Sequence, residues 1–373
     1  MCANRLVIAA AGSGKTSLII SEAMENQQDK ILITTFTLAN EQSIKQRLIK
    51  ANNGTIPSNI TIQPWFSFLL EHGIRPYRYW NKRVDGLKLT NEPSGIKYSF
   101  KKNGKVINVQ WSEDGNFYEH YFTNMDVYSD KIAKLVIKCN EESAGRVILR
   151  LERIINRIYI DEVQDMAGWD LEIIKLLLKS SIRVTMVGDP RQTVYHTHIE
   201  KKYSNYLNGR IREFIQKECK RICIIDEQTL KNSHRNIAAI CALSSKLYPE
   251  YSECHSLLTQ THRHTGIFFV RESDVQEYSV IASPLQLRYD SGITMLLTTP
   301  VMNFGLAKGL EAKHVLIYPT IDMLKWLNGA QDTLKFATKA KLYVALTRAF
   351  FSVGIVVSNN FQSNTQEICL WKS

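Results

Sequence analysis

Residues 9–16, AAAGSGKT, have the composition of a phosphate-binding loop. They follow the apolar run Leu6–Ile8 and precede residues 17–24, SLIISEAM, which are typical of a helix. Small residues let backbone N–H groups close around phosphates at a helix N-terminus, while Lys15 reaches the β and γ phosphates and the Thr16 hydroxyl ligates Mg²⁺. Alanine at the first position replaces the usual glycine, so an ordinary glycine-rich turn is the alternative. The predicted phosphate contacts are Ala9, Ala10, Ala11, Gly12, Ser13, Gly14, Lys15 and Thr16.

A pair of carboxylates follows a second apolar run. Residues 154–160, IINRIYI, are rich in β-branched side chains and lead directly into Asp161 and Glu162. Parallel α/β sheets place functional groups at the carboxyl ends of buried strands. In that position Asp161 would hold Mg²⁺ through water, and Glu162 would act as general base toward the attacking water. An acidic surface turn at the end of a strand is the alternative.

A third apolar run, residues 183–187, leads into the polar segment GDPRQTVY at residues 188–195. A strand followed by such a loop would place Gln192 at the same edge of the predicted sheet. A neutral amide can contact a γ-phosphate or the attacking water without adding charge. We therefore predict that Gln192 belongs to the same catalytic site.

These segments and four others, all in the expected order, resemble the UvrD/Rep-like superfamily 1 DNA helicases. DEVQD at residues 161–165 resembles the DExxD box of that family, and residues 187–195 resemble VGDxxQSIY. The other matching segments are ILITTFT at 31–37, LKNSHR at 230–235, AKGLE at 307–311 and YVALTRA at 343–349. The resemblance extends over nearly the whole chain outside residues 66–150 and 240–295. It indicates a compact form in which the large accessory insertions are reduced or absent.

The resemblance implies an α/β fold of two RecA-like P-loop domains with parallel sheets and ATP in the cleft between them. It assigns Arg235 and Arg348 of the second domain to the charge that develops on the γ-phosphate. Surface or core salt bridges are the alternative roles for these arginines. The resemblance also places Gly309 and Glu311 near the ribose. Domain closure on ATP and opening after hydrolysis would then move the protein along a DNA strand.

The sequence departs from the family pattern at three places. His234 replaces the tyrosine that stacks on the base, and imidazole stacks over a smaller area. Phe36 and Tyr195 are the implied DNA contacts, but Thr197 stands where a tryptophan usually stacks on the translocating strand. Its loss would weaken binding by about 1–3 kcal/mol per base unless the insertion compensates. Eight residues precede the loop, too few for the upstream glutamine motif that reads adenine, so base selectivity stays open.

The motifs divide the chain into two expected motor domains. The first covers residues 1–220, with an insertion at about 66–150, and the second covers residues 221–373. Residues 204–220 have helical spacing, and residues 221–225 are expected to begin the second sheet. Further strands of that sheet are expected near residues 267–270, 315–318 and 353–357.

The insertion is predicted to be mainly β with some helix. Alternating patterns indicate strands at residues 96–100, 106–111 and 117–122, with Asn103-Gly104 and Asp114-Gly115 as hairpin turns. Helical segments are expected near residues 130–139 and 142–154. Basic and aromatic residues alternate in this meander: Lys97, Tyr98, Lys101, Lys102, Lys105, Trp111, Tyr118 and Tyr121. They suit nucleic-acid binding and the packing of a small exposed sheet equally well.

Composition sets wider limits on the class of protein. The 373 residues include 47 Lys and Arg against 36 Asp and Glu, a net charge of +11 that suits an anionic partner such as nucleic acid, or only a solvated lysine-rich surface. A hydrophobic content of 44% excludes a largely disordered chain. Apolar runs are too short for a membrane helix, and the start does not resemble a signal peptide. We therefore expect a soluble cytoplasmic protein without a membrane partner.

Seven scattered cysteines suit a reducing compartment and free thiols better than a disulfide framework. One small cluster, Cys254, His255, His262 and His264, contains the residue types of a zinc site but not its usual spacing. A polar surface loop is the alternative for these residues.

The leading hypothesis is an ATP-dependent single-stranded DNA translocase or helicase, 3′ to 5′ by family analogy, acting on single-stranded or tailed duplex DNA with ATP and Mg²⁺. A second hypothesis is a DNA-activated ATPase that regulates a partner nuclease and unwinds little by itself. Compact UvrD-like motors that resemble this chain occur beside OLD-family nucleases in antiviral defence systems. The missing tryptophan favours the second hypothesis, whereas the complete set of hydrolysis residues favours the first. An RNA helicase fits the motif types less well.

Overall fold

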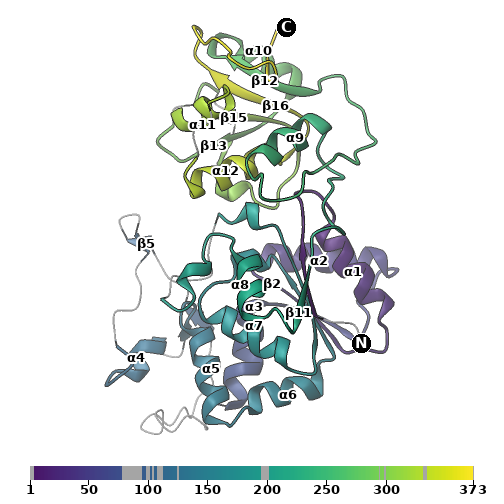
Figure 1. The fold of residues 1–373 in the computed structure, drawn as a ribbon, viewed down its shortest axis with the longest axis vertical. Coiled ribbons are helices and arrows are strands. Elements are labelled where there is room, and N and C mark those ends of the chain that lie inside the picture. Colours follow the sequence, from purple (N-terminus) through teal and green to yellow (C-terminus); the bar gives the residue numbers. More distant parts are fainter. Residues whose placement is uncertain are drawn as a thin grey trace. The chain divides into compact units, whose positions relative to one another are not determined.

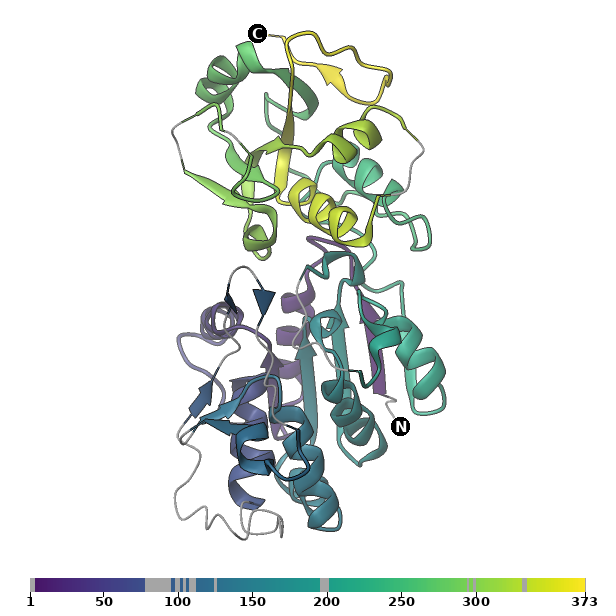
Figure 2. The same ribbon diagram turned by 90° about the vertical axis from the view of Figure 1, so that its left-hand side faces the viewer.

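The computed structural model describes residues 4–77, 95–97, 101–102, 105–106, 112–123, 126–194, 201–293, 295–297, 300–330 and 334–372. The chain forms two compact units. Unit 1 comprises Met1–Val7, Thr16–Gly188 and His196–Asp226, and unit 2 comprises Ile8–Lys15, Asp189–Tyr195 and Glu227–Ser373. Each unit contains a six-stranded parallel sheet flanked by helices (Figures 1 and 2). This confirms the predicted α/β fold of two RecA-like domains.

The sheet of unit 1 has the strand order β11-β1-β10-β9-β2-β3. Its strands are β1 (Asn4–Ile8), β2 (Ile31–Thr35), β3 (Ile60–Pro64), β9 (Arg157–Asp161), β10 (Arg183–Gly188) and β11 (Cys223–Asp226). All five positions of β2 and of β9 are buried. Central parallel strands are covered on both faces, which explains why these segments are apolar runs rather than alternating patterns.

Helices cover both faces of this sheet. They are α1 (Lys15–Glu25), α2 (Leu38–Ala51), α7 (Trp169–Lys179) and α8 (Ile211–Glu218). Right-handed crossovers that run in opposite directions along the sheet put α1 and α2 on one face and α7 and α8 on the other, as Figure 1 shows. The hydroxyl of Thr37 caps α2 by accepting a hydrogen bond from the Asn40 backbone N–H at 3.1 Å.

The insertion in unit 1 contains helices where they were predicted, α5 (Ile132–Glu142) and α6 (Arg146–Ile154). Before them, α3 (Trp65–Phe68) continues as a π-helix, Leu69–Ile74, and a 3₁₀ turn, Arg75–Tyr77. The short strands are β4 (Gly95–Lys97), β5 (Lys101–Lys102), β6 (Lys105–Val106), β7 (Phe122–Thr123) and β8 (Asp126–Tyr128). β5 pairs antiparallel with β6, as the predicted Asn103-Gly104 hairpin requires, although those two turn residues lie outside the described part.

The third strand of the predicted meander is wrong, because residues Phe117–Tyr121 form helix α4. Phe117 and Tyr121 lie one helical turn apart with ring centroids at 4.7 Å, and Tyr118 stacks on Phe122 at 5.2 Å. Aromatic pairs at this spacing stabilise a helical turn. Asp114-Gly115 therefore forms a turn before a helix instead of a hairpin. Tyr121 is fully buried, so its ring serves packing rather than DNA stacking.

The expected start of the second sheet at residues 221–225 is also wrong. The strand there, β11, pairs in parallel with β1, from Asn4 opposite Cys223 to Val7 opposite Asp226, and so completes the first sheet. The helical stretch predicted for residues 204–220 is shorter, with a 3₁₀ turn at Ser204–Tyr206 before α8. The boundary placed at residue 220 therefore falls before the last strand of unit 1.

The sheet of unit 2 has the order β14-β13-β15-β16-β12-β17. Its strands are β12 (Gly266–Arg271), β13 (Leu285–Arg288), β14 (Val301–Asn303), β15 (Ala312–Tyr318), β16 (Ala349–Val357) and β17 (Cys369–Leu370). Every pair is parallel. Three of these strands, β12, β15 and β16, lie where the sequence predicted them.

Alternate residues of these strands belong to two different hydrophobic clusters, one on each face of the sheet. Ile317 packs in the cluster that includes residues of α9 (Ala238–Lys246), α11 (Ile321–Leu327) and α12 (Phe336–Leu346). Leu316 and Tyr318 pack in the cluster that includes residues of α10 (Val275–Ala282). This alternation is the period of two expected of a strand covered on both sides.

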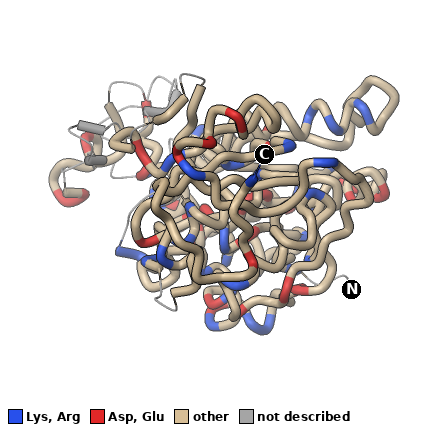
Figure 3. Tube along the Cα trace, turned by 90° about the horizontal axis from the view of Figure 1, so that it is seen from above, with Lys and Arg blue, Asp and Glu red and all other residues tan. Residues whose placement is uncertain are grey.

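The remaining expectations from composition can be compared with the described residues. Six cysteines there, all except Cys2, are free thiols. None of the described helices is both long and apolar enough to cross a membrane. Lys and Arg are interspersed with Asp and Glu along the trace (Figure 3). The net positive charge therefore does not by itself mark a DNA path.

Candidate functional site

The predicted acidic pair lies at the end of β9 in unit 1. Asp161 is buried, and its Oδ1 accepts a hydrogen bond of 2.9 Å from the backbone N–H of Glu162. Glu162 adopts a left-handed conformation with φ of 54°, which costs a non-glycine residue about 1–3 kcal/mol. Its carboxylate accepts a 2.5 Å hydrogen bond from Gln164 Nε2. The two adjacent carboxylates thus have different hydrogen-bond partners, which suits two different roles.

Of the two predicted DNA contacts, the structure describes Phe36 but not Tyr195. Phe36 follows β2 and is half-buried, with its ring edge-on to Phe66 at 5.5 Å. Just before it, the hydroxyls of Thr34 and Thr35 are buried, and neither has a hydrogen-bond partner among the described residues. Tyr195 lies outside the described part of the chain.

The glycine-rich loop has a backbone that only glycine adopts readily at two positions. Gly12 and Gly14 have φ of +71° and +91°, values that favour glycine. Helix α1 begins at Lys15, so the amides of its first turn face the loop. Ser13 Oγ is buried and has no hydrogen-bond partner within the described residues. These features fit a bound nucleoside triphosphate, with the Thr16 hydroxyl, in unit 1, as the predicted Mg²⁺ ligand.

The same loop contacts the segment that contains His234 and Arg235, within unit 2. Ala10 N–H donates to the Leu230 carbonyl at 2.7 Å, and His234 N–H donates to the Gly12 carbonyl at 2.9 Å. The side chain of His234 is exposed. Two segments separated by more than two hundred residues are therefore joined by backbone hydrogen bonds.

Replacing Gly12 by Ala is expected to destabilise unit 2 and to abolish nucleotide binding. A Cβ atom at this position would lie 2.5 Å from Arg235 Cβ and 2.7 Å from Ser233 Oγ, in addition to the strain of a positive φ. We expect a loss of about 2–4 kcal/mol in the free energy of unfolding. Gly54→Ala is the matched control, because its φ is +96° but a Cβ there would meet nothing within 4 Å. Equal shifts in the midpoints of thermal unfolding for the two variants would contradict the prediction.

Gln192 and Arg348, both predicted to be catalytic, are brought together in unit 2. Arg348 Nη2 donates to Gln192 Oε1 at 3.2 Å. Arg348 is 1% exposed, and its other donors bind the carbonyls of Val344 and Leu310, each at 3.1 Å. The guanidinium is therefore fixed before any ligand arrives, as a preorganised electrostatic group should be.

Arg235 and Glu311 form an ion pair with each other. Arg235 Nε lies 3.1 Å from Glu311 Oε1, and Arg235 Nη1 donates to the Thr347 carbonyl at 3.4 Å. Gly309, two residues before the glutamate, has φ of +87°. The sequence predicted separate contacts for this arginine and glutamate, with the γ-phosphate and the ribose. The structure adds that the glutamate holds the arginine in unit 2.

Sequence reasoning missed three buried polar residues that surround Gln192: Asp189, Arg191 and Tyr343. Asp189 Oδ2 accepts hydrogen bonds from Gln192 Nε2 at 2.8 Å and from the Tyr343 hydroxyl at 3.1 Å. The Tyr343 hydroxyl in turn accepts a bond of 3.3 Å from the backbone N–H of Ala11. A charged residue directly after an apolar strand was the available signal for Asp189.

The zinc alternative for residues 254–264 is wrong. Among the described residues, no group of three or more His, Cys, Asp and Glu side chains is arranged to hold a metal ion. Cys254 is buried with its thiol 3.8 Å from that of Cys241. His262 stacks instead on Phe351 at 5.0 Å, and His264 lies against Phe268 at 5.2 Å. Both rings also lie against His314, with ring centroids at 4.7 Å from His262 and 5.4 Å from His264.

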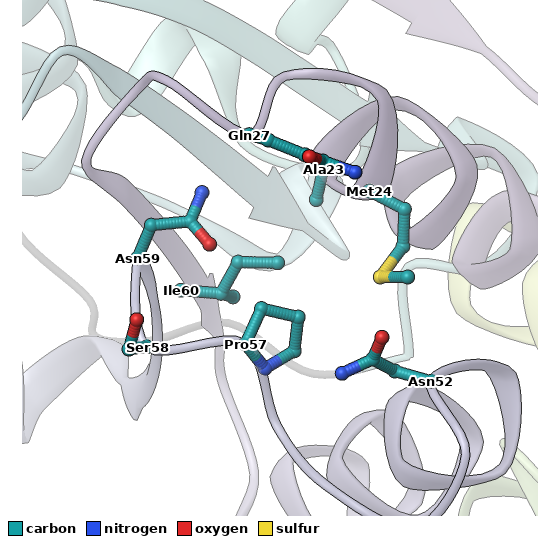
Figure 4. Close-up of a pocket in the computed structure, with 8 residues that line it drawn as sticks. All are labelled: Ala23, Met24, Gln27, Asn52, Pro57, Ser58, Asn59 and Ile60. Carbon is teal, nitrogen blue, oxygen red and sulfur yellow. The ribbon is translucent and has the colours of Figure 1, made fainter.

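A cavity of about 370 Å³ lies in unit 1, and none of the predicted site residues lines it. Figure 4 shows its lining, Ala23, Met24, Gln27, Asn52, Pro57, Ser58, Asn59 and Ile60. The cavity is next to the amino-terminal end of β3, whereas the acidic pair follows the carboxyl end of β9. Parallel α/β sheets carry their functional groups at the carboxyl ends, so this cavity is not the nucleotide site.

Comparison with known families gives one clear match. The model of the UvrD/REP helicase N-terminal domain matches residues 1–72 and 88–199. These ranges include the glycine-rich loop, the acidic pair and Gln192, and they omit the residues between 72 and 88 inside the insertion.

Two curated relatives are ATP-dependent DNA helicases Rep from Buchnera aphidicola. The protein of subspecies Acyrthosiphon pisum (strain APS) is 25% identical over 241 residues, covering 51% of this chain and 36% of the relative. That of subspecies Schizaphis graminum (strain Sg) is 26% identical over 286 residues, covering 65% of this chain and 41% of the relative. The chain thus spans about two fifths of the length of these relatives.

Solved structures that resemble this one include the arterivirus nonstructural protein 10 helicase. Its crystal structure is 14% identical, with a TM-score of 0.47, and covers 98% of this chain and 62% of that one. Its complex with DNA is 15% identical, with a TM-score of 0.48, and covers 95% and 60% of the two chains.

Proposed function

The chain belongs to the UvrD/REP helicase family through its N-terminal domain, and on that premise we propose that it is an ATP-dependent DNA translocase or helicase. The observation that carries this proposal is the contact between Gln192 and the buried guanidinium of Arg348. An amide and an arginine held together are suited to contact a γ-phosphate and to stabilise its charge. Both belong to the same unit as residues 8–15 of the glycine-rich loop.

ATP supplies the phosphoanhydride bond, and Mg²⁺ bound with it spreads the charge of the phosphate oxygens. Lys15 and the amides that begin α1 would bind the phosphates, and Thr16 and Asp161 would hold the metal. Glu162 would accept the proton of the attacking water. Gln192 would orient that water, and Arg235 and Arg348 would stabilise the developing negative charge. His234, Gly309 and Glu311 would contact the nucleoside.

DNA binding is the second part of the proposal. Phe36 and Tyr195 are the residues of this chain that match the DNA-contacting positions of the family. The curated relatives named above are DNA helicases. We propose single-stranded or tailed duplex DNA as the partner and 3′ to 5′ as the direction of movement.

Strand displacement on tailed duplexes tests this function. With ATP and Mg²⁺, the purified chain is expected to displace a labelled strand from a 3′-tailed duplex and not from a 5′-tailed duplex. Single-stranded DNA is expected to stimulate ATP hydrolysis, measured as phosphate release. Lys15→Ala serves as the control, because loss of the phosphate-binding amine should abolish both activities.

The assay also separates the two hypotheses. DNA-stimulated hydrolysis without displacement of either duplex would contradict an autonomous helicase and favour a DNA-activated ATPase that serves a partner such as a nuclease. Preference for the 5′-tailed duplex would contradict only the proposed direction. The absence of both hydrolysis and displacement would contradict the proposed function as a whole.

A further inference from the structure

Arg191 is a buried charge in the loop that carries Gln192. It lies in the 3₁₀ turn Pro190–Gln192, which is capped by Asp189, and it is 4% exposed. Its guanidinium lies 5.3 Å from the ring of Tyr251 and 5.3 Å from the ring of Tyr343. Burial opposes its charge, but the Asp189 carboxylate together with Tyr343 and Cys254 raises the pKa of Arg191 above its ordinary value. The guanidinium therefore stays charged between two aromatic rings.

The guanidinium has two polar contacts, one with a side chain and one with the backbone. Arg191 Nε donates to Asp189 Oδ1 at 2.7 Å, and Arg191 Nη2 donates to the backbone carbonyl of Ala9 at 2.8 Å. Ala9 is the first residue of the glycine-rich loop. One side chain thus connects the start of the phosphate-binding loop with the carboxylate that holds Gln192.

Asp189 links Arg191 to the amide of Gln192 through hydrogen bonds. Its side chain is fully buried and accepts hydrogen bonds from four donors: the N–H and Nε of Arg191, Nε2 of Gln192 and the hydroxyl of Tyr343. Because Gln192 Nε2 is bound to Asp189, the amide oxygen is the atom that faces Arg348. The orientation of Gln192 is therefore set by this network before a nucleotide binds.

We propose that Arg191 is a positioning residue for nucleotide binding, which holds the Ala9 carbonyl directly and the Gln192 amide through Asp189. This inference rests on the proposed function, since it concerns the same nucleotide site. Arg191 does not touch the reacting atoms. It fixes the positions of two segments that would contact the phosphates. These segments, residues 9–16 and residues 189–192, are far apart in the sequence.

Lysine cannot replace arginine in this role. The guanidinium places two separate N–H donors on two acceptors, whereas an ammonium on a flexible stem presents one point charge. Arg191→Lys keeps the charge beside Asp189, so the contact between Asp189 and Gln192 should persist. The contact with the Ala9 carbonyl should be lost. The substitution therefore tests the contact with the Ala9 carbonyl independently of the contact between Asp189 and Gln192.

The test compares nucleotide affinity with turnover in the full chain. Arg191→Lys is expected to weaken the binding of N-methylanthraniloyl ATP, and to raise the KM for ATP, by about tenfold, while kcat changes by less than about twofold. Gln192→Ala is expected to do the reverse, with kcat lower by about 10²-fold and affinity unchanged. Arg263→Lys, an exchange at an exposed position of the same unit, is the matched control. Unchanged affinity in Arg191→Lys would overturn the inference.

A second variant guards against simple unfolding. Arg191→Met alone would leave a buried carboxylate without its counter-charge, which is strongly destabilising. Combining it with Asp189→Asn removes both charges at similar volume, so the double variant is expected to unfold near the temperature of the unaltered chain and still to bind nucleotide at least about tenfold more weakly. Normal affinity in this folded double variant would overturn the inference. Failure of the unaltered chain to bind the nucleotide would instead overturn the proposed function.

Discussion

Replacing Glu162 by Gln is expected to lower the rate of ATP hydrolysis by about 10²–10⁴-fold while nucleotide affinity stays unchanged. The amide has nearly the same size as the carboxylate and retains one oxygen to accept the hydrogen bond from Gln164 Nε2. It cannot accept the proton of the attacking water at neutral pH. Phosphate release in the presence of single-stranded DNA measures the loss, and equilibrium binding of a fluorescent ATP measures what remains.

The matched control is Glu213→Gln on helix α8. Glu213 also lies in unit 1, but it forms a surface ion pair with Arg210, whose Nε lies 2.8 Å from Glu213 Oε1. Such pairs contribute at most about 1 kcal/mol, so this variant should hydrolyse ATP normally. Hydrolysis at the normal rate by Glu162→Gln would show that another group is the general base.

Replacing Arg348 by Lys is expected to lower kcat by about 10³-fold or more, because an arginine that stabilises the charge of a transferred phosphoryl group contributes about 10³–10⁵ in rate. Lysine has one nitrogen in place of three and cannot reach Val344, Leu310 and Gln192 together. Loss of the contact with Gln192 removes the alignment of the two groups. Steady-state hydrolysis and nucleotide binding should be measured on the same preparation.

Stability decides how that result is interpreted. Arg348 is 1% exposed, so a variant with poor packing could lose activity by unfolding. Thermal unfolding of Arg348→Lys should therefore be compared with that of Arg263→Lys, which changes an exposed arginine of the same unit. A folded Arg348→Lys protein that hydrolyses ATP normally would contradict the assigned role and leave Arg348 as a core hydrogen-bonding residue.

The sequence predicted the elements that local composition determines. Strands β2, β9 and β10 were recognisable because central parallel strands are apolar on both faces. β11 was assigned to the wrong sheet, since the partner of an edge strand depends on the path of the chain and not on its own residues. Residues 117–121 were mistaken for a strand because aromatic residues suit both structures, and only the ring pairs one turn apart reveal the helix.

The sequence predicted the site residues that belong to recognisable motifs. It did not predict residues whose role is to position another side chain. The strand-and-loop pattern named Gln192 and the resemblance named Arg348, and their contact follows from the fold. Neither identified Arg191, because a charged residue in a polar loop predicts exposure on average, and its burial depends on Tyr251 and Tyr343 from distant segments. The roles proposed for His234, Gly309 and Glu311 stay predictions.

The division of the chain into its two units limits where the gene can recombine without loss of contacts. Residues 8–15 and 189–195 belong to unit 2, although the segments on either side of each belong to unit 1. A recombination event near residue 226 would therefore replace Leu230 and Tyr343 while leaving behind Ala10 and Ala11, their hydrogen-bond partners. The bond between Ala10 and Leu230 joins two backbone groups, so only the bond of Ala11 depends on a side chain, the Tyr343 hydroxyl. A second half without this hydroxyl would leave the Ala11 N–H without that partner.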